Sequence, residues 1–498
     1  MRTRFAPSPT GNLHVGGLRT ALYAWLLARQ SGGQFLVRVE DTDKEREVPG
    51  AIEQMLKALA WAGIEPDEGV VLENGAVSQK GGNGPYIQSQ RLGLYKAAAD
   101  KLLAQGDAYY AFDTKEDLDA MRAREQAAGN PAPKYDASVR MRMRNSLTLP
   151  KEDTEKLLKD NAPYVIRLKM PEGETLGWDD AIRGPVSFHS RDVDDQVLLK
   201  SDGFPTYHLA HVVDDHGMKI DLVLRGEEWL SSTPKHLVLF RALGYPVPRY
   251  AHVPLMLNSD RSKLSKRQGD VSVDEYSTKG YLPEALVNFV AFLGWNPGTT
   301  QEIFTLKEMI EAFSLERVQK GGAVFDLQKL DWLQGQWMRS LPEDEFAKRA
   351  KEASVSRVPA VLADAEFGKK SALIRERITF FTEAPDMLGF FYERPTPDTG
   401  LMANPKQKVE LPDLPRYLGL LESILDLIPE DGWNDQRILA DVKATVERDG
   451  LKLGQLLWPL RAVLTGRAYS PGAVEVAAVL GKAETMERVR AAMKVAGA

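Results

Sequence analysis

Residues 3–40, TRFAPSPTGNLHVGGLRTALYAWLLARQSGGQFLVRVE, decide the fold of this chain. Residues 3–6 favour a β-strand, which two prolines and a glycine then interrupt. Residues 13–29 carry leucine and tryptophan at three- and four-residue steps, which is the spacing of a helix, and the glycine pair 32–33 ends it. Residues 34–40 favour a second strand. A strand–helix–strand unit of this size predicts a parallel sheet with its ligand crevice at the carboxyl ends of the strands.

The sequence that follows predicts an inserted module and then a return to alternating strands and helices. Residues 74–84 are rich in Gly and Asn, and we expect a surface loop there. From about residue 91 to 129 the chain is mostly helical in pattern. Short strands are expected at 109–112, 163–170, 186–189 and 197–200, so the middle stretch is predicted to be an α+β insertion. Strand and helix alternate again through residues 221–224 and 233–243.

After residue 330 the sequence shows almost only helical periodicity, for example at 418–427 and 473–480. We therefore expect an α/β chain: a Rossmann-type parallel-sheet catalytic domain with an inserted α+β module, followed by a mostly α-helical C-terminal region. The expected limits are 1–90 and 191–245 for the Rossmann-type domain, 91–190 for the inserted module, 246–328 for a domain with a Lys-Leu-Ser-Lys-Arg loop, and 329–498 for the helical region.

The composition narrows the class of protein. Of 498 residues, 43% are hydrophobic and 27% are charged, a mixture that excludes wholesale disorder. There is no uninterrupted apolar run of about 18 residues and no apolar core of a secretion signal, so we expect no membrane partner and a cytoplasmic location. Cysteine is absent, which excludes disulfides and thiolate metal ligands. The net charge of −6 still allows a nucleic-acid partner, because a local basic face is sufficient.

The first candidate site is Ser8–Gly17, SPTGNLHVGG. A glycine-bearing turn leads into the start of a helix, where unpaired N–H groups and the helix dipole favour phosphate. His14 could donate a hydrogen bond to phosphate oxygens, and Gly16 and Gly17 would let a purine approach the backbone. An ordinary strand-to-helix turn with a core histidine fits the same residues.

The second candidate site is Ser262–Asp270, SKLSKRQGD, which places three cations, hydroxyl groups and a glycine in one segment. Such a loop can close over a triphosphate and neutralise the charge of a leaving pyrophosphate. A solvated basic turn or a general nucleic-acid-binding patch is the alternative.

Together the two motifs resemble the two signature sequences of class I aminoacyl-tRNA synthetases. The run RFAPSPTGxLHVGGxRTAL, followed by FLVRVEDTD, is similar to the bacterial glutamyl-tRNA synthetase branch of that class. The resemblance continues through Gly84–Tyr86, Gln88–Arg91, Lys200–Gly203, Pro205–His208, Val212–Asp215, Leu224–Trp229, Phe325–Leu327 and Lys452–Gln455. It therefore covers most of the chain.

The resemblance implies an enzyme that activates L-glutamate with ATP and Mg²⁺ to glutamyl-adenylate, and then transfers it to the terminal adenosine of tRNA-Glu. It implies catalytic roles for His14, Lys263 and Lys266. The residues implied to bind ATP are Pro7, Ser8, Pro9, Thr10, Gly11, His14, Gly16, Gly17, Lys263, Leu264, Ser265, Lys266 and Arg267. A carboxylate is already a nucleophile at neutral pH, so positioning and charge stabilisation would supply most of the catalysis.

The residues that the resemblance implies for glutamate binding are Arg4, Ala6, Ser8, Glu40, Tyr207 and Arg225. Arg4 and Arg225 would bind the side-chain carboxylate, because a guanidinium can hold a carboxylate with two parallel hydrogen bonds. Glu40 would bind the substrate's ammonium group. Taken without the resemblance, these three charges fit equally well a buried ion-pair network that ties strands together.

Three positions depart from the general class pattern. Gly17 stands where the first signature often has His, and Arg267 ends the second signature in place of Ser; both variants are similar to the glutamyl branch. His211 stands where some relatives carry Asn. Certain relatives hold zinc through cysteines in the inserted module, whereas this chain has Ala108–Phe112, AYYAF, at the corresponding place. We expect an aromatic cluster there and no zinc.

The resemblance also implies that the inserted module 91–190 binds the acceptor end of tRNA, that 246–328 contacts its stem, and that the helical region 329–498 reads the anticodon. This makes tRNA-Glu an expected partner beside ATP and L-glutamate. Arg375, Arg377, Lys452 and Arg461 are candidates for contacts with phosphates or unstacked bases. Solvated helix faces are the alternative for each of them. The branch is usually monomeric, and we expect a monomer.

Four other interpretations of the same motifs compete with a glutamyl-tRNA synthetase. Glutaminyl-tRNA synthetases read the anticodon with β-barrels, which the helical periodicity after residue 330 disfavours. A shorter relative that modifies tRNA-Asp with glutamate lacks an anticodon module. A catalytically silent tRNA-binding paralogue and a stand-alone nucleotidyltransferase are the other two. The sequence leaves open whether the enzyme charges tRNA-Gln as well as tRNA-Glu.

Overall fold

The computed structural model describes residues 1–264 and 272–497. The chain divides into two compact units. The first unit comprises Met1–Lys279 and Pro283–Leu330, and the second comprises Gly280–Leu282 and Asp331–Ala498.

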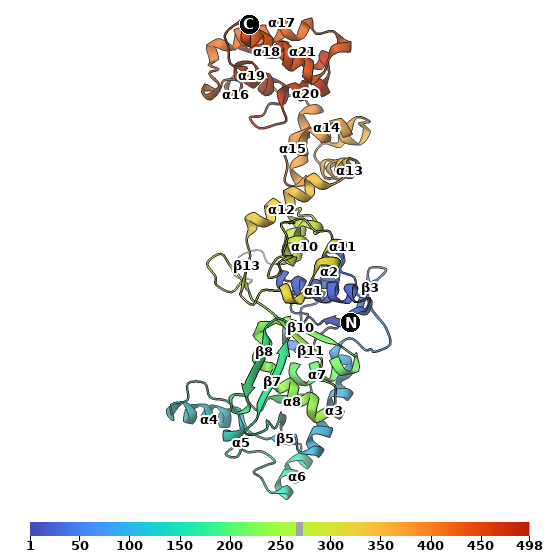
Figure 1. The fold of residues 1–498 in the computed structure, drawn as a ribbon, viewed down its shortest axis with the longest axis vertical. Helices are drawn as coiled ribbons and strands as arrows, with labels where there is room; N and C mark the ends of the chain where they lie inside the picture. The colour runs from blue at the N-terminus through green and yellow to red at the C-terminus, as the bar shows by residue number, and fades with distance from the viewer. Residues whose placement is uncertain (265–271, 498) are drawn as a thin grey trace. The chain divides into compact units, whose positions relative to one another are not determined.

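The first unit is built on an eight-stranded sheet in the order β4-β3-β2-β1-β10-β11-β7-β8 (Figure 1). Its strands are β1 (Arg2–Phe5), β2 (Gln34–Val37), β3 (Glu68–Glu73), β4 (Ala76–Lys80), β7 (Thr175–Asp180), β8 (Gly184–His189), β10 (Leu222–Gly226) and β11 (Arg249–Val253). The six inner strands, β3, β2, β1, β10, β11 and β7, pair in parallel. The two edge strands are antiparallel to their neighbours: β4 to β3 and β8 to β7. The predicted parallel α/β sheet is confirmed.

The predicted first unit of strand, helix and strand is β1, α1 (Val15–Gln30) and β2. α1 packs on β1, β2 and β10, and Leu18, Leu22 and Leu26 on it are fully buried. β1 lies between β2 and β10, so the first strand of the chain is central in the sheet. Burial on both faces explains why β10 begins with the apolar run Leu-Val-Leu.

The remaining helices of the first unit are α2 (Ala51–Trp61), α3 (Leu92–Gln105), α4 (Lys115–Ala127), α5 (Ala137–Arg140), α6 (Lys151–Lys159), α7 (Tyr207–Gly217), α8 (Thr233–Leu243), α9 (Val273–Thr278), α10 (Pro283–Ala291) and α11 (Leu306–Ala312). β12 (Met256–Leu257) and β13 (Ala323–Val324) form a two-stranded parallel sheet.

The expected surface loop at residues 74–84 is wrong in part, because it contains β4. Asn74 and Gly75 both have positive φ, at 53° and 79°, and join β3 to β4 as a tight hairpin. An Asn-Gly pair is the common choice for this two-residue turn. β4 is an exposed edge strand without an alternating apolar pattern, which is why its sequence resembles a loop.

The middle of the chain contains a separate three-stranded antiparallel sheet, in the order β5 (Ala108–Ala111), β6 (Val165–Leu168) and β9 (Val197–Leu199). The strand expected at 186–189 does not join it. That strand is part of β8, which pairs with β7 at the edge of the large sheet. The two sheets share one hydrophobic core, in which α3 residues such as Tyr95 pack near Leu198 of β9 and Phe240 of α8.

The second unit is helical in its regular structure, as the periodicity predicts. Its helices are α13 (Glu343–Ser354), α14 (Phe367–Ile374), α15 (Ala384–Leu388), α16 (Thr399–Met402), α17 (Leu414–Leu427), α18 (Asp435–Arg448), α19 (Leu453–Thr465), α20 (Ala473–Leu480) and α21 (Lys482–Ala496); α12 (Leu327–Ser340) contains the boundary between the units. Figure 1 shows α17, α18, α19 and α21 gathered in one group, and α17 packs against the other three.

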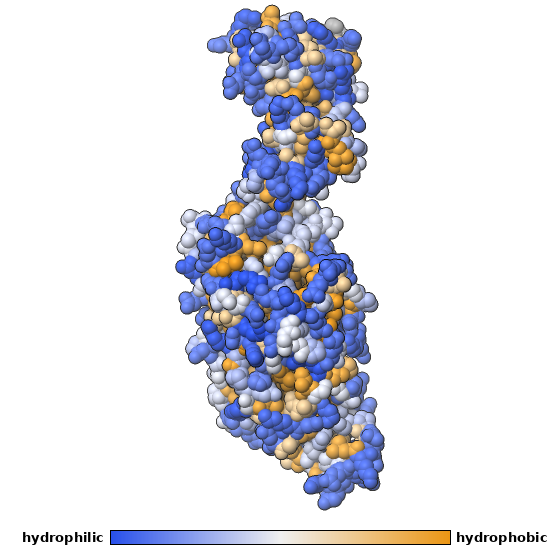
Figure 2. All heavy atoms as spheres, turned by 90° about the vertical axis from the view of Figure 1, so that its right-hand side faces the viewer, coloured by the Kyte–Doolittle hydropathy of each residue, from blue (hydrophilic) through white to orange (hydrophobic). Residues whose placement is uncertain are grey.

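In the part of the chain that the structure describes, no helix is long and apolar enough to cross a membrane. Figure 2 shows one face of the molecule, on which hydrophilic side chains predominate and hydrophobic ones lie in smaller groups between them.

Candidate functional site

A cavity of about 380 Å³ lies at the carboxyl ends of β1 and β10, where the parallel sheet predicts a ligand crevice. It brings together these predicted residues: Arg4, Ala6, Ser8, His14, Gly16, Gly17, Glu40, Tyr207, Arg225, Lys263 and Leu264. Pro7, Pro9, Thr10 and Gly11 do not line it, whereas Arg19, Thr20, Glu228, Trp229 and Met256 line it without having been predicted. Ser265, Lys266 and Arg267 lie outside the described residues.

His14 is the N-cap residue of α1. Its Nδ1 accepts a hydrogen bond from the N–H of Gly16 at 2.9 Å, which satisfies one of the unpaired donors at the start of the helix. A neutral imidazole that accepts at Nδ1 carries its proton on Nε2. The first turn has no acidic residue and exposes Gly16 and Gly17 to the cavity, so the start of α1 can receive an anion.

A side chain at position 17 would crowd its apolar neighbours. A Cβ there would lie 2.9 Å from Cδ1 of Leu13 and 3.5 Å from the ring of Phe5. The absence of a side chain also keeps this turn of α1 open toward the cavity. Glycine at this position therefore suits both the packing against Leu13 and the access to the cavity.

The second predicted motif reaches the same cavity. Leu264 donates its N–H to the carbonyl of Met256 at 2.9 Å, and Lys263 forms a β-bridge with Leu257. On the other side of residues 265–271, Ser272 forms a bridge with His14. The described residues that flank this segment thus lie beside the start of α1, and Lys263 and His14 line one cavity.

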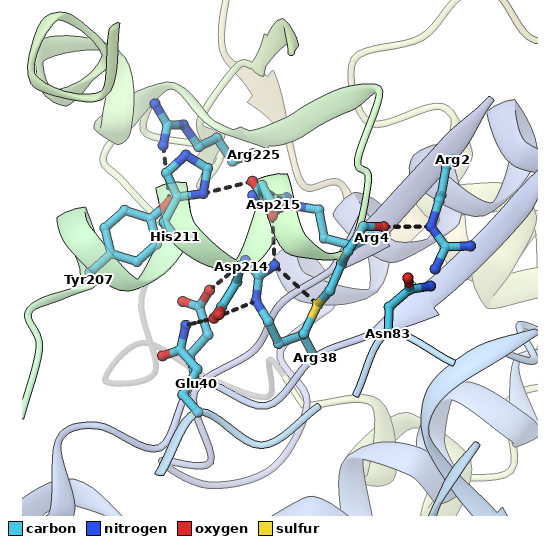
Figure 3. Close-up of polar contacts among 12 residues, drawn as sticks. Arg2, Arg4, Arg38, Glu40, Asn83, Tyr207, His211, Asp214, Asp215 and Arg225 are labelled. Atoms are coloured by element: carbon cyan, nitrogen blue, oxygen red, sulfur yellow. Dashed lines mark hydrogen bonds and ion pairs between the residues drawn. The ribbon is translucent and has the colours of Figure 1, made fainter. Parts of the chain in front are cut away.

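A cluster of buried charges includes two residues that line the cavity, Arg4 and Glu40, and Figure 3 shows the contacts within this cluster. Arg38 is completely buried and lies between three carboxylates: its Nη2 is 3.0 Å from Glu40, its Nη1 is 2.6 Å from Asp215, and its Nε is 3.6 Å from Asp214. Arg4 shares Asp215 through its Nε at 3.2 Å. The predicted ion-pair alternative therefore holds for Arg4 and Glu40, although both also line the cavity.

The pKa values in this cluster follow from burial and from the arginines. Burial raises the pKa of Glu40, and the charges of Arg38 and Arg4 oppose that effect. The pKa of Asp215 stays well below its usual value, because Arg4, Arg38 and His211 outweigh the cost of its burial. Asp215 is therefore ionised at neutral pH and fixes the guanidinium of Arg4.

Arg225 has a different environment, because its described partners are all neutral. Its Nε donates to Nε2 of His252 at 3.0 Å, and its Nη1 donates to the Tyr207 hydroxyl at 3.0 Å and faces Nδ1 of His236 at 3.2 Å. Its Nη2 donates to the Thr233 hydroxyl at 2.9 Å and, more weakly, to the carbonyl of Trp229 at 3.4 Å. No carboxylate among the described residues forms an ion pair with it, although it is only 5% exposed. A buried cation of this kind favours the binding of an anion.

His211 does not line the cavity. Its ring stacks on Tyr207, with centroids 5.3 Å apart, and its Nδ1 lies 2.8 Å from Asp215. Burial lowers its pKa to about 3, so the ring is neutral at physiological pH. His211 therefore contacts Tyr207 and Asp215 from outside the cavity and helps to hold both side chains in place.

Several residues of the site were not predicted as such. Asp214 and Asp215 were noted only as part of a motif, and Arg38, Thr233, His236 and His252 were not assigned a role. One signal was available. Two consecutive aspartates, Asp214 and Asp215, directly follow Val212 and Val213 on the buried helix α7, and buried acidic residues need cationic partners.

The aromatic cluster expected at residues 108–112 is present. Tyr110 meets Tyr164 edge to face at 5.1 Å and lies near Phe112, while Tyr109 is buried and donates to Asp195 at 2.7 Å. Within residues 1–264 and 272–497 there is no group of three or more acidic, His or Cys side chains suited to a metal ion. The absence of zinc stays a prediction.

The predicted tRNA contacts all lie in the second unit. Arg375 donates to the carbonyls of Arg339 and Leu341, so it joins α14 to the end of α12. Arg377 and Lys452 are exposed, and the guanidinium of Arg461 lies 6.0 Å from the ring of Trp458. Their contacts with RNA stay predictions.

Comparison with known proteins identifies relatives over the full length. Residues 1–332 match the family described as "tRNA synthetases class I (E and Q), catalytic domain", and residues 336–493 match "Anticodon binding domain". Glutamate–tRNA ligase of Chlorobaculum parvum is 44% identical, over 98% of this chain and 97% of its own length. That of Alkaliphilus metalliredigens is 42% identical, over 98% of both chains. The crystal structure of a glutamate tRNA ligase from Elizabethkingia meningosepticum in complex with its amino acid is 37% identical, with a TM-score of 0.88 and 99% coverage of both chains.

Proposed function

This chain belongs to the glutamate–tRNA ligases of class I. From that premise we propose which part of its cavity binds glutamate and which part binds ATP. The enzyme activates glutamate with ATP and transfers it to tRNA. In the first step an oxygen of the α-carboxylate forms a bond to the α-phosphorus of ATP. The bond from that phosphorus to the bridging oxygen breaks, and pyrophosphate leaves with the electron pair. In the second step the oxygen of a terminal ribose hydroxyl of tRNA forms a bond to the carbonyl carbon of the adenylate. The bond from that carbon to the phosphate oxygen breaks, AMP leaves with the electron pair, and the hydroxyl proton is released.

Glutamate binds between Arg4 and Arg225 in this proposal. The observation that carries it is the buried, unneutralised guanidinium of Arg225 in the wall of the cavity. The weakest of the five hydrogen bonds of Arg225 is the one from Nη2 to the Trp229 carbonyl, at 3.4 Å. A substrate carboxylate replaces that carbonyl as the acceptor. Arg4 supplies N–H groups from its other edge, since its Nε is held by Asp215. Glu40 then faces the ammonium group, and Ser8, Ala6 and Tyr207 complete the pocket.

The nucleotide occupies the part of the cavity formed by the start of α1 and Lys263. The Nε2–H of His14 and the N–H groups of the first turn donate to phosphate oxygens, and Lys263 adds a positive charge. We assign Lys266 and the rest of the Lys-Leu-Ser-Lys-Arg motif to the same triphosphate from sequence alone. The family uses ATP with Mg²⁺, which neutralises phosphate oxygens when it is bound. The carboxylate of Glu228 lines the cavity and is an oxygen donor of the kind that Mg²⁺ accepts.

The second unit reads the tRNA anticodon in this proposal. Its match to an anticodon-binding domain supports that assignment, and the exposed Arg377 and Lys452 are candidate contacts. The domain limits given from sequence also stay part of the proposal. Charging assays with purified tRNA-Glu and tRNA-Gln would separate an enzyme specific for the first from one that accepts both.

The test of amino-acid specificity is pyrophosphate exchange with glutamate or glutamine, each with and without tRNA-Glu. We expect exchange with glutamate in the presence of tRNA, and at least about a hundredfold lower kcat/KM with glutamine, because a neutral amide leaves Arg225 without an anionic partner. Faster exchange with glutamine would contradict the assignment of the pocket. Absence of exchange under all four conditions would favour a protein without catalytic activity.

Replacing His14 with Ala should lower kcat/KM for ATP about a hundredfold, because one donor to the phosphates is lost. The same change removes the N-cap of α1, which costs about 1 kcal/mol of stability. His14→Asn is the matched control, since Asn restores the cap but its side chain is shorter. Equal activity loss in both variants supports the phosphate contact, whereas near-normal activity of His14→Asn would reduce His14 to a cap.

A further inference from the structure

Three strands contribute one buried side chain each to a row that ends at Arg225. Asp180 ends β7, His252 lies on β11, and Arg225 lies on β10 as the direct register partner of His252. Nδ1 of His252 is 2.5 Å from Oδ2 of Asp180, and its Nε2 accepts from Arg225 Nε at 3.0 Å. Only Arg225 of the three lines the cavity.

The chemistry of arginine fixes the proton on His252. A guanidinium has N–H donors and no acceptor, so Nε2 of His252 must present its lone pair to Arg225. The ring proton is then on Nδ1 and is donated to Asp180. A carboxylate cannot donate at neutral pH, so it enforces the same tautomer from the other side.

Asp180 is itself held in place. Its Oδ1 accepts the N–H groups of Ile182, Arg183 and His252 at 3.0 to 3.2 Å, which leaves Oδ2 directed at the imidazole. These hydrogen bonds and His252 lower the pKa of Asp180 to about 2 in spite of its burial. The carboxylate is therefore ionised throughout the physiological range.

We propose that Asp180 and His252 are positioning residues for the reaction: Asp180 holds His252 in the Nδ1–H tautomer, and His252 fixes the rotation of the Arg225 guanidinium so that its Nη groups meet the glutamate side chain. This inference rests on the proposed role of Arg225. If the ring carried its proton on Nε2, two donors would face each other at 3.0 Å and Arg225 would turn away.

A second imidazole row reaches Arg225 from the other side. His236 must accept from Arg225 at Nδ1, so its Nε2–H donates to Nδ1 of His208 at 3.0 Å. Burial lowers the pKa of both rings, that of His208 to about 3. No carboxylate within residues 1–264 and 272–497 is hydrogen-bonded to His208 or His236, so this row contacts Arg225 without imposing the tautomer on His252.

The decisive variant is Asp180→Asn. It has the same shape, and its remaining oxygen can keep the three backbone hydrogen bonds, but its NH₂ group donates to Nδ1 and so forces the proton of His252 onto Nε2. We expect KM for glutamate in tRNA-dependent pyrophosphate exchange to rise about 10- to 100-fold, with KM for ATP unchanged. A general loss of structure would instead move both constants together with the melting temperature.

Two further variants at His252 serve as a matched pair. His252→Gln offers an amide oxygen that can accept from Arg225, and it should recover part of the glutamate affinity that His252→Leu loses. Asp180→Asn should add nothing in an Arg225→Gln background, because the residue that it positions is gone.

The outcomes are separable. A normal glutamate KM in Asp180→Asn, together with an impaired one in Arg225→Gln, would overturn the positioning role and leave the proposed function intact. A normal glutamate KM in Arg225→Gln would overturn the proposed pocket itself. Parallel increases of the glutamate and ATP constants in Asp180→Asn would also overturn the positioning role, in favour of a structural one.

Discussion

Arg225→Gln is expected to lower kcat/KM for glutamate by about a thousandfold. Removing one member of a buried charge pair commonly costs about 2–5 kcal/mol, and about 4 kcal/mol corresponds to a factor of roughly a thousand. The effect should be large because the side chains that contact Arg225, those of His252, His236, Thr233 and Tyr207, are neutral and cannot replace its charge. Tyr207 loses a donor at the same time.

The measurement is steady-state pyrophosphate exchange with tRNA-Glu, with glutamate and ATP varied in turn. KM for ATP should change little, and the preference for glutamate over glutamine should fall because the introduced amide side chain carries no charge. Arg29→Gln is the control: Arg29 lies in the same unit, pairs with Asp67 and does not line the cavity. A tenfold or smaller loss in Arg225→Gln would show that Arg4 alone neutralises the substrate.

Arg38→Met is expected to destabilise the first unit by about 3–5 kcal/mol, because it removes the ion-pair partner of Glu40 and one of the two cations beside each of Asp214 and Asp215. Arg38 is fully buried and supplies the ion-pair contact of Glu40, while Asp215 keeps Arg4 and Asp214 keeps Arg91. Met has a similar length and no charge, so little volume is lost. The loss is measured as the change in the free energy of unfolding in urea, followed by a signal from the first unit.

The pH dependence distinguishes lost charge pairing from lost packing. In the native protein the pKa of Asp215 is depressed, so its contribution to stability is complete above the unfolded pKa and is lost as the pH falls through the folded pKa. Without Arg38 that pKa rises. The stability difference between the two proteins should therefore be largest near pH 7 and should narrow as the pH falls below about 4. A pH-independent difference would indicate a packing defect, and Arg38→Lys should be intermediate because it keeps the charge without the planar fork.

Local patterns predicted the elements whose sequence matches their environment. The helical spacing of residues 13–29 corresponds to α1, and the apolar segment at 221–224 corresponds to most of β10. β4 was missed because an exposed edge strand has no apolar face to repeat. The strand at 186–189 was assigned to the wrong sheet. It joins the large sheet because β8 pairs with β7 and β7 pairs with β11, and local sequence does not encode such pairing.

The site was predicted where residues stand in recognisable motifs. His14, Glu40, Arg225 and Lys263 all line the cavity. The role of Asp180 was not predicted, because it acts through His252, 72 positions later in the chain. Only the register of three strands shows that these residues meet.

The central position of β1 has a consequence for synthesis of the protein. β1 is made first, yet one of its two neighbours in the sheet, β10, is made after more than two hundred further residues. Arg4 and Arg225 therefore cannot bind the same ligand until the ribosome has synthesised β10. Arg225 gains its contact with His252 only after β11 has also been synthesised. A polypeptide released from the ribosome before that point would lack the amino-acid pocket, so glutamate could stabilise only chains that extend beyond β11.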